Sequence, residues 1–522
     1  MSFEINQGKQ RAILLVMALS VLVVVMDLTI LNVALASIQR ELGASNADLQ
    51  WSLDAYLITF AAFIFTGGVI ADRFGRKRVL IGALVLFGLA SVLAAEATSA
   101  WQLIVWRALM GVGAAAIPPV TLAILLTIFP PAMRPKAIGV WAGAAGVGTA
   151  VGPIIGGLLL NSFWWGSVLL INAPLAVLAI AAIVWLVPEA TGPQAGSFDP
   201  VGVLLSIAGV GALVYGIVQG GEDSWLAMGT LGPILGGVIL LAALVAFERR
   251  LAIPALDLSL LRASRYAAGT FAIAFAFFAL LGAVFITSIY FQAVLGLAPA
   301  NAGLLMVPMG LGALLTSTRV APLVARYGAR VVVSTGSAVM ALSFLIFALV
   351  GRQSPIWVLA LAQLILGLGW GSVFAPATGA LMSVVQPAKA GAGQAVANTF
   401  RQVAGALGVA VIGSLLSMRF RATLGSAAEV LPDSLVAKAR ESLGGTLEAL
   451  RAAGGQIPPA AAEGLKVQAQ DAYVSGMHLT MLVCLAFALC AAIIALRGLP
   501  GKPPPATAAP AAPAAAPEAA SR

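Results

Sequence analysis

The strongest constraint on the fold is a succession of apolar runs, each about as long as a bilayer is thick. A helix needs about 20 apolar residues to cross the hydrocarbon core of a membrane, and runs of that length follow one another from Ile13 to Arg497. Charged residues make up 9% of the chain, whereas soluble domains carry roughly 25%. Lipid offers backbone groups no hydrogen-bond partner, so such runs must form helices or closed barrels. The sequence therefore predicts an all-α integral membrane protein.

The apolar runs predict fourteen membrane spans, and an even number places both termini on the same side. The first run is too long for the apolar region of a signal peptide, which spans about 7–15 residues, so it is interpreted as the first span. The approximate limits are 11–36, 50–71, 78–96, 101–128, 137–160, 166–187, 200–219, 229–248, 268–294, 301–324, 330–350, 355–384, 393–417 and 475–497.

The distribution of charge predicts the orientation of these spans. Most of the 29 Lys and Arg residues fall in loops on one side, and the cytoplasmic loops of membrane proteins are enriched in both. Trp101 and Trp357 lie at the opposite ends of their spans, where an interfacial belt is expected. We therefore expect a multi-pass protein of the bacterial inner membrane with both termini in the cytoplasm. The net charge of +9 lies between apolar spans rather than on one soluble face, which argues against a nucleic-acid partner.

A weak internal repeat predicts two six-helix bundles. The stretch "ADRFGRK" at 71–77 recurs as "ARYGAR" at 325–330, and "GVGAAAIP" at 111–118 recurs as "GWGSVFAP" at 369–376. Repeats of this kind are typical of transporters, and they leave spans 7 and 8 as an inserted pair. The predicted units are an N-terminal bundle (1–190), the inserted pair (191–262), a C-terminal bundle (263–498) and a disordered Pro/Ala-rich tail (499–522).

One long segment, 419–474, interrupts the C-terminal bundle. It is rich in alanine, carries scattered charge and is broken by two glycine pairs. This composition predicts an outer helical hairpin between spans 13 and 14, with a disordered loop as the alternative.

The first cytoplasmic hairpin, "GGVIADRFGRKRVLIG", contains residues that a basic turn between two spans does not need. The preference for positive charge in the cytoplasm explains its Arg and Lys residues but not Asp72 or Gly68. The stretch resembles the G-x-x-x-D-R-x-G-R-[KR] motif of the major facilitator superfamily. The resemblance implies a conformational latch that holds one access state, made of Gly68, Asp72, Arg73, Gly75 and Arg76. In the second copy of the motif Ala325 replaces the acid, so any latch would differ between the two halves.

The stretch "GVWAGAAGVGTAVGPIIGG" at 139–157 places small residues along one helical face. Small residues let helices pack closely in lipid, and packing alone is one interpretation. The G-P-x-x-G-G element resembles the antiporter motif of the same superfamily, which implies a helix sealed against the opposite half in an exporter. The residues concerned are Gly143, Gly146, Gly152, Pro153, Gly156 and Gly157.

Asp27 lies inside the first span, where a charged side chain costs ~2.5–3.5 kcal/mol on insertion scales. Its surroundings, "DLTILNVAL", resemble the opening motif of the fourteen-span drug:proton antiporters, and Arg107 in "WRALMGVG" matches that family's arginine in span 4. At ~1.5 Å per residue the two side chains lie at comparable depth. Burial disfavours a charged carboxyl group and a nearby arginine favours it, so a coupling site for protons is predicted. The alternatives are a permanent structural pair and direct contact with substrate.

A second set of residues is predicted to contact substrate. Asp54 in "W-x-x-D-x-Y" is either a hydrated acid at a helix end or, by resemblance to the exporters of quaternary ammonium compounds, an attractor of lipophilic cations. Aromatic rings beside it would add cation–π contacts. That branch carries acids in spans 10 and 13, which this chain lacks. The full predicted set is Asp54, Tyr56, Trp51, Asn32, Gln292, Asn398 and Arg401.

These observations predict a proton-coupled exporter of amphipathic, cationic compounds. The alternatives are a dedicated exporter of a natural product or lipid, and an uptake symporter on the same fold. An enzyme is not expected, because the chain has a single histidine, His478, and no nucleotide-binding loop. We expect no cofactor and no metal, a monomer, and the small-molecule substrate, protons and the lipid bilayer as partners.

Overall fold

The computed structural model describes residues 6–44, 46–130, 133–189, 200–222, 225–248, 258–386 and 390–501, and within them only helices, turns and bends. The N-terminal half holds α1 (Gln7–Leu42), α2 (Asn46–Phe74), α3 (Arg76–Ala95), α4 (Ala100–Ile128), α5 (Arg134–Leu160), α6 (Ser167–Leu170) and α7 (Asn172–Leu186). The rest holds α8 (Pro200–Glu222), α9 (Met228–Glu248), α10 (Ser264–Ile289), α11 (Pro299–Leu304), α12 (Val307–Phe347), α13 (Ile356–Met382), α14 (Ala390–Leu424), α15 (Asp433–Glu441), α16 (Leu443–Ala453) and α17 (Pro459–Gly498).

Each predicted span lies on one or more of these helices, and the all-helical fold class is confirmed. Among the described residues eleven helices are long and apolar enough to cross a membrane, or twelve when the bent α2 is counted as one span. The glycine-rich α5 is not among these eleven, and Asn301–Ser317 is a shorter apolar helix. The count of fourteen therefore stays a prediction.

The two halves share a backbone break at the same place in the repeated motif. Gly75 (φ 100°, ψ 126°) separates α2 from α3, and Gly328 (φ 83°, ψ 158°) lies inside α12, which joins the two predicted spans 301–324 and 330–350. A positive φ favours glycine because it has no Cβ. The neighbouring side chains also match, with Arg73 5.6 Å from the ring of Phe74 and Arg326 5.2 Å from the ring of Tyr327.

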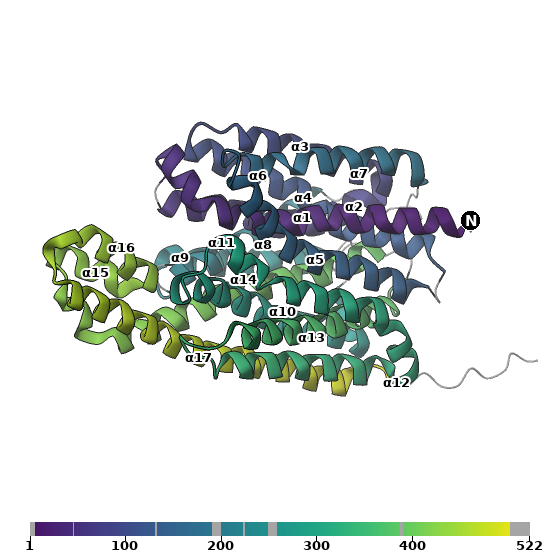
Figure 1. Cartoon of the computed structure of the whole chain (residues 1–522). Coiled ribbons are helices and arrows are strands. Elements are labelled where there is room, and N and C mark those ends of the chain that lie inside the picture. The colour runs from purple at the N-terminus through teal and green to yellow at the C-terminus, as the bar shows by residue number, and fades with distance from the viewer. Residues whose placement is uncertain are drawn as a thin grey trace, which may run out of the picture.

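The helices gather into two groups that meet along α5. Figure 1 shows α1, α3, α4 and α7 on one side and α10, α12, α13 and α17 on the other. α5 packs against α1 in its own group and against α12 and α13 in the other, and α2 packs against α14. α4 also packs against α14, so α2, α4 and α5 of the N-terminal half contact the C-terminal half.

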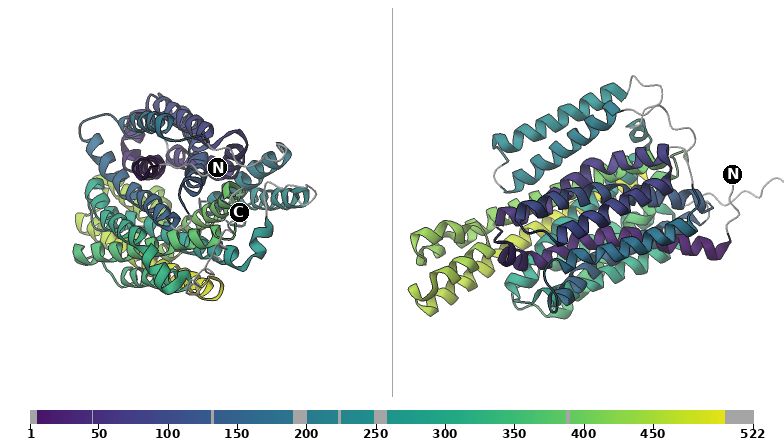
Figure 2. Two further views of the ribbon diagram at one scale, coloured as in Figure 1. Left: turned by 90° about the vertical axis from the view of Figure 1, so that its right-hand side faces the viewer. Right: turned by 90° about the horizontal axis from the view of Figure 1, so that it is seen from above.

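The pair α8 and α9 lies beside the two groups, as the second view of Figure 2 shows. α8 packs against α9, and also against α2 and α14. Trp51 of α2 stacks on Tyr215 of α8 with ring centroids 5.7 Å apart, and the Trp225 indole donates to Ser414 Oγ of α14 at 3.1 Å. The predicted insertion is therefore attached to one helix of each group.

Residues 419–474 are mostly helical, as predicted, and the position of this segment outside the membrane stays a prediction. α14 and α17 extend beyond their predicted spans, and α15 and α16 pack against each other between them, at the end of the molecule opposite the N-terminus (Figure 1). Lys438 of α15 pairs with Glu448 of α16 at 2.7 Å, and Ser442 Oγ accepts from the Gly445 amide at 3.1 Å to cap α16.

Candidate functional site

The structure brings Asp27 of α1 and Arg107 of α4 into direct contact. Arg107 Nη1 donates to Asp27 Oδ2 at 2.6 Å, and the side chains are 1% and 0% exposed. Removing one partner from a buried ion pair typically costs about 3–5 kcal/mol, because the other charge is left uncompensated. The pair therefore holds α1 against α4 as long as Asp27 stays charged.

Two polar residues that sequence reasoning did not select complete the surroundings of Asp27. Asn172, at the start of α7, donates from Nδ2 to Asp27 Oδ1 at 2.8 Å and is within 3.1 Å of Ser91 Oγ. Ser91 in turn donates to the Leu169 carbonyl at 2.8 Å. Both carboxylate oxygens are thus hydrogen-bonded, each to a different helix. The stretch "INAP" around Asn172 is the feature of the sequence that could have indicated it.

Tyr56 of α2 lies under the guanidinium group of Arg107. The Arg107 Cζ is 4.3 Å from the centroid of the Tyr56 ring, and Arg107 Nε donates to the Ser52 carbonyl at 3.2 Å. Tyr56 is 0% exposed, and its hydroxyl has no hydrogen-bond partner. The ring predicted to contact a cationic substrate is therefore occupied by a cation of the protein itself.

Glycines let the helices that carry these side chains approach closely. A Cβ at Gly111 of α4 would lie 2.5 Å from the Tyr56 carbonyl oxygen of α2, and Thr59 Oγ1 donates across the same contact to the Ala108 carbonyl at 2.8 Å. Small residues at helix contacts are how helices associate in lipid, where apolar burial gives little driving force. The position of Tyr56 under Arg107 follows from this contact.

The predicted glycine face of α5 contacts two different partners. A Cβ at Gly152 would lie 2.7 Å from the Met26 carbonyl of α1, and one at Gly156 would lie 2.9 Å from Ile30 Cγ1 of the same helix. Gly143 instead faces α12 of the other group, where a Cβ would lie 2.8 Å from Leu314 Cδ1. Gly157 is buried, whereas the surroundings of Gly146 and Pro153 lie outside the described part of the chain.

Gly152→Ala is expected to destabilise the protein and to reduce transport. The added methyl group would press on α1 beside Asp27, and overpacking a close contact typically costs about 1–3 kcal/mol. The matched control is Gly236→Ala in α9, where nothing lies within 4 Å of an added Cβ. Thermal unfolding of the purified variants and transport by each would be measured. Equal behaviour of the two variants would contradict the close packing of α1 on α5.

The predicted latch residues form a network within the N-terminal half. Arg76 of α3 pairs with Asp72 of α2 at 2.8 Å, and its Nη1 donates to the Ala123 carbonyl at 3.2 Å and to Thr127 Oγ1 at 2.5 Å, both at the end of α4. A Cβ at Gly75 would lie 2.5 Å from Glu189 Oε1. The network ties three helix ends together, and its release in another access state stays a prediction.

The other predicted latch residues, Arg73 and Gly68, also lie toward this end of α2. Arg73 is exposed and Gly68 is buried in α2. The close approach of α2 to α4 is made by the adjacent Gly67, whose Cβ would lie 2.7 Å from Ala116 Cα.

The remaining predicted substrate residues are not gathered at one place. Asp54 is half-buried, Gln292 is exposed in the π-helical turn Tyr290–Val294, and Trp51 stacks on α8. Asn398 and Arg401 lie one turn apart on α14. Asn32 lies on α1, and its side chain is outside the described part of the chain.

Comparison with known proteins identifies the family. A family model described as Major Facilitator Superfamily matches residues 17–409. The chain belongs to the major facilitator superfamily. The multidrug resistance protein Stp of Mycobacterium tuberculosis is 33% identical over 412 residues, which cover 79% of this chain and 76% of that protein. The multidrug efflux pump LfrA of Mycolicibacterium smegmatis is 31% identical over 480 residues, 92% of this chain and 94% of that protein.

A solved structure shows the same fold. The proton:xylose symporter XylE matches with a TM-score of 0.59 and 16% sequence identity, covering 95% of this chain and 97% of that one. The family match and the efflux and resistance proteins among the relatives show that this chain is a multi-pass membrane transporter, and the predicted family is confirmed.

Proposed function

We propose that this superfamily member exports amphipathic compounds across the bacterial inner membrane in exchange for protons. The observation that carries the proposal is the contact between Asp27 and Arg107, because Asp27 is the one fully buried carboxylate among the described residues. An ionisable residue inside a membrane span is a candidate for a functional site. The names of Stp and LfrA, resistance and efflux proteins, support export as the direction.

The geometry suggests how a proton could change the packing of the helices. Protonation of Asp27 removes the charge that balances Arg107, and it turns a charge-assisted hydrogen bond into a weaker one. Arg107 keeps the Tyr56 ring and the Ser52 carbonyl on α2 as partners. The attachment of α1 to α4 therefore weakens when Asp27 takes a proton, and the attachment of α2 to α4 does not. Such a difference between two protonation states is what coupling to a conformational change requires.

The larger movement would take place between the two bundles. In this proposal residues 1–190 and 263–498 rock against each other across the contacts of α5 with α12 and α13, and of α2 with α14. The Asp72–Arg76 network would stabilise one of the access states. Both termini would face the cytoplasm, the chain would work as a monomer, and transport would need no cofactor and no chemical reaction on the substrate.

The proposal predicts that transport stops when the proton gradient is removed. Everted membrane vesicles energised by respiration have an acidic lumen, so an antiporter loads them with substrate. Uptake of a fluorescent amphipathic dye is expected to stop when a protonophore collapses the proton gradient, and added substrate should release protons from the lumen. Uptake that continues after the protonophore would contradict proton coupling, and protons moving in the same direction as the substrate would indicate a symporter.

A further inference from the structure

The most unusual charged group in the C-terminal half is Arg401, in the middle of α14. Its Cζ is 4.9 Å from the ring of Phe277 in α10 and 5.4 Å from the ring of Phe374 in α13. The side chain is partly buried, and its Nε is buried without a hydrogen-bond partner. Among the described residues Arg401 makes no ion pair. Two aromatic rings and no carboxylate therefore surround this cation.

The sequence offers this cation no acid on helices α10 to α14. No Asp or Glu occurs between residues 258 and 428, a stretch that covers all of α10 to α14, and the acids of this half begin at Glu429. In the other half Asp27 is bound to Arg107 and Asn172, and Asp72 is bound to Arg76. A buried charge without a counter-charge destabilises the protein, so a role other than stability accounts for Arg401.

A second unpartnered hydrogen-bond donor lies on the same face of α14. Asn398 precedes Arg401 by three residues, a spacing that puts both on one side of a helix. Asn398 is 1% exposed, and its Oδ1 accepts from Gln394 Nε2 at 3.4 Å, which leaves the buried Nδ2 without a partner. Gln394 Oε1 lacks a partner as well. The face thus offers two free donors, one of them charged, and one acceptor.

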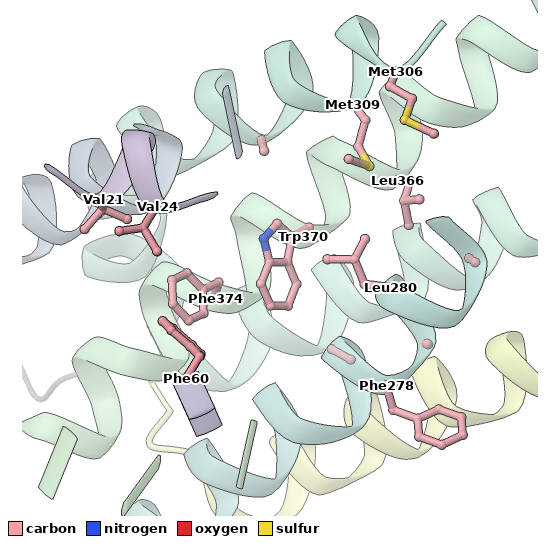
Figure 3. Close-up of a cluster of buried hydrophobic side chains, with 14 of the residues drawn as sticks. Val21, Val24, Phe60, Phe278, Leu280, Met306, Met309, Leu366, Trp370 and Phe374 are labelled. Atoms are coloured by element: carbon pink, nitrogen blue, oxygen red, sulfur yellow. The ribbon is translucent and has the colours of Figure 1, made fainter. Parts of the chain in front are cut away.

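Aromatic side chains from both halves surround this face. The rings of Trp141 and Phe374 are 5.9 Å apart, those of Phe374 and Trp370 5.1 Å, and those of Trp370 and Phe277 5.6 Å. Trp141 belongs to α5, so the series runs from one half into the other. Figure 3 shows Phe374 and Trp370 in one buried cluster with Phe60 of α2. Flat apolar surfaces beside a guanidinium group suit a compound that carries both an aromatic body and an acidic group.

A cavity near this end of the bundle is lined by positively charged side chains. It has a volume of about 980 Å³ and lies between the ends of α4 and α5 and the C-terminal half. Among the described residues that line it there is no acid. Clefts with charge of one sign concentrate ligands of the opposite sign. The arginines that line it are Arg134, Arg265, Arg330 and Arg497.

We propose that Arg401 and Asn398 bind the acidic group of the substrate, a carboxylate or sulfonate on an aromatic, amphipathic compound. This inference rests on the proposed transport function and replaces the cationic substrate that the sequence predicts. The arginine-lined cavity attracts the anion, the guanidinium group neutralises it, and the rings of Phe277, Phe374 and Trp370 contact its apolar body. The unpaired charge of Arg401 is then compensated whenever substrate is bound.

The test compares two dyes that share one ring skeleton, anilinonaphthalene sulfonate and the uncharged phenylnaphthylamine, with ethidium as the cation. In everted vesicles we expect the sulfonate to be accumulated in response to the pH gradient. Arg401→Gln is expected to raise the KM for the sulfonate by about 10- to 100-fold, because a hydrogen bond to a charged group is lost. The KM for the uncharged dye should change less than about twofold. Arg401→Lys, which keeps the charge, should retain most of the preference for the sulfonate over the uncharged dye.

The matched control is Arg419→Gln, the same change at an exposed arginine of α14 whose Nε donates to Ser475 Oγ at 3.1 Å. We expect it to transport all three dyes as the wild type does. An equal loss of both naphthyl dyes in Arg401→Gln, or pH-driven transport of ethidium without the sulfonate, would overturn the assignment of an acidic substrate while leaving proton-coupled export in place. If no dye were moved by the pH gradient, the proposed function would fail and this inference with it.

Discussion

Replacing Asp27 by asparagine is expected to abolish transport against a gradient while substrate still binds. The amide has nearly the same shape and can accept the hydrogen bond from Arg107, but it can neither take up nor release a proton. Without a titrating group the exchange of substrate for protons has no carrier. We therefore expect the rate of pH-driven uptake to fall to the level of vesicles without the protein, and downhill movement of substrate to persist.

The control for this variant is Asp471→Asn. Asp471 also pairs with an arginine, Arg352, at 2.7 Å, but its side chain is 59% exposed. Exposed ion pairs contribute about 0–1 kcal/mol, so this variant should transport normally. Uptake and proton release would be recorded in the same vesicles. Asp27→Asn vesicles that load substrate at the wild-type rate would refute the assignment of Asp27 as the coupling group.

Replacing Arg107 by glutamine is expected to cause the largest loss of stability, which a second substitution should restore in part. Alone, the change leaves Asp27 charged, fully buried and held by Asn172 only, and breaking a buried pair in this way typically costs about 3–5 kcal/mol. In the double variant Asp27→Asn, Arg107→Gln neither charge remains. We expect the double variant to lose less free energy of unfolding than the sum of the two single variants.

A double-mutant cycle of thermal unfolding in detergent measures this difference. A coupling energy near zero would show that the two side chains do not depend on each other, contrary to the 2.6 Å contact. The double variant also separates folding from function, because it should be folded and yet unable to use the proton gradient. Normal proton-driven transport by the double variant would place the coupling group elsewhere.

The positions of the helices could be predicted from the sequence because hydrophobic length is a local property. The segment after α14 was predicted from composition in the same way, and its helices are present. The predicted spans 301–324 and 330–350 lie on either side of the kink at Gly328 in α12, where the backbone leaves the helical conformation. The number of spans could not be settled in the same way, because α5 is helical over its predicted span but is not among the helices that are long and apolar enough to be counted.

The site was only partly predictable, because its polar contacts depend on how the helices pack. Asp27 and Arg107 could be paired from depth and sequence pattern alone. The hydrogen bond from Asn172 to Asp27 could not be predicted, because it depends on how α7 packs against α1. Tyr56 is predicted to contact substrate because the sequence does not show that Arg107, from another helix, lies against its ring. The sequence predicts Arg401 as a contact of substrate, but only the structure shows that aromatic rings and no acid lie beside it.

The attachment of α8 bears on the rocking movement proposed above. α8 contacts α2 through the Trp51–Tyr215 stack, and the loop that follows it contacts α14 through Trp225 and Ser414. In the proposed movement these two attachment points would belong to different bundles, so separating α2 from α14 would require one of the two contacts to slide or break. The inserted pair would therefore resist opening on its own side, and the side of α5 and α12 would open more widely.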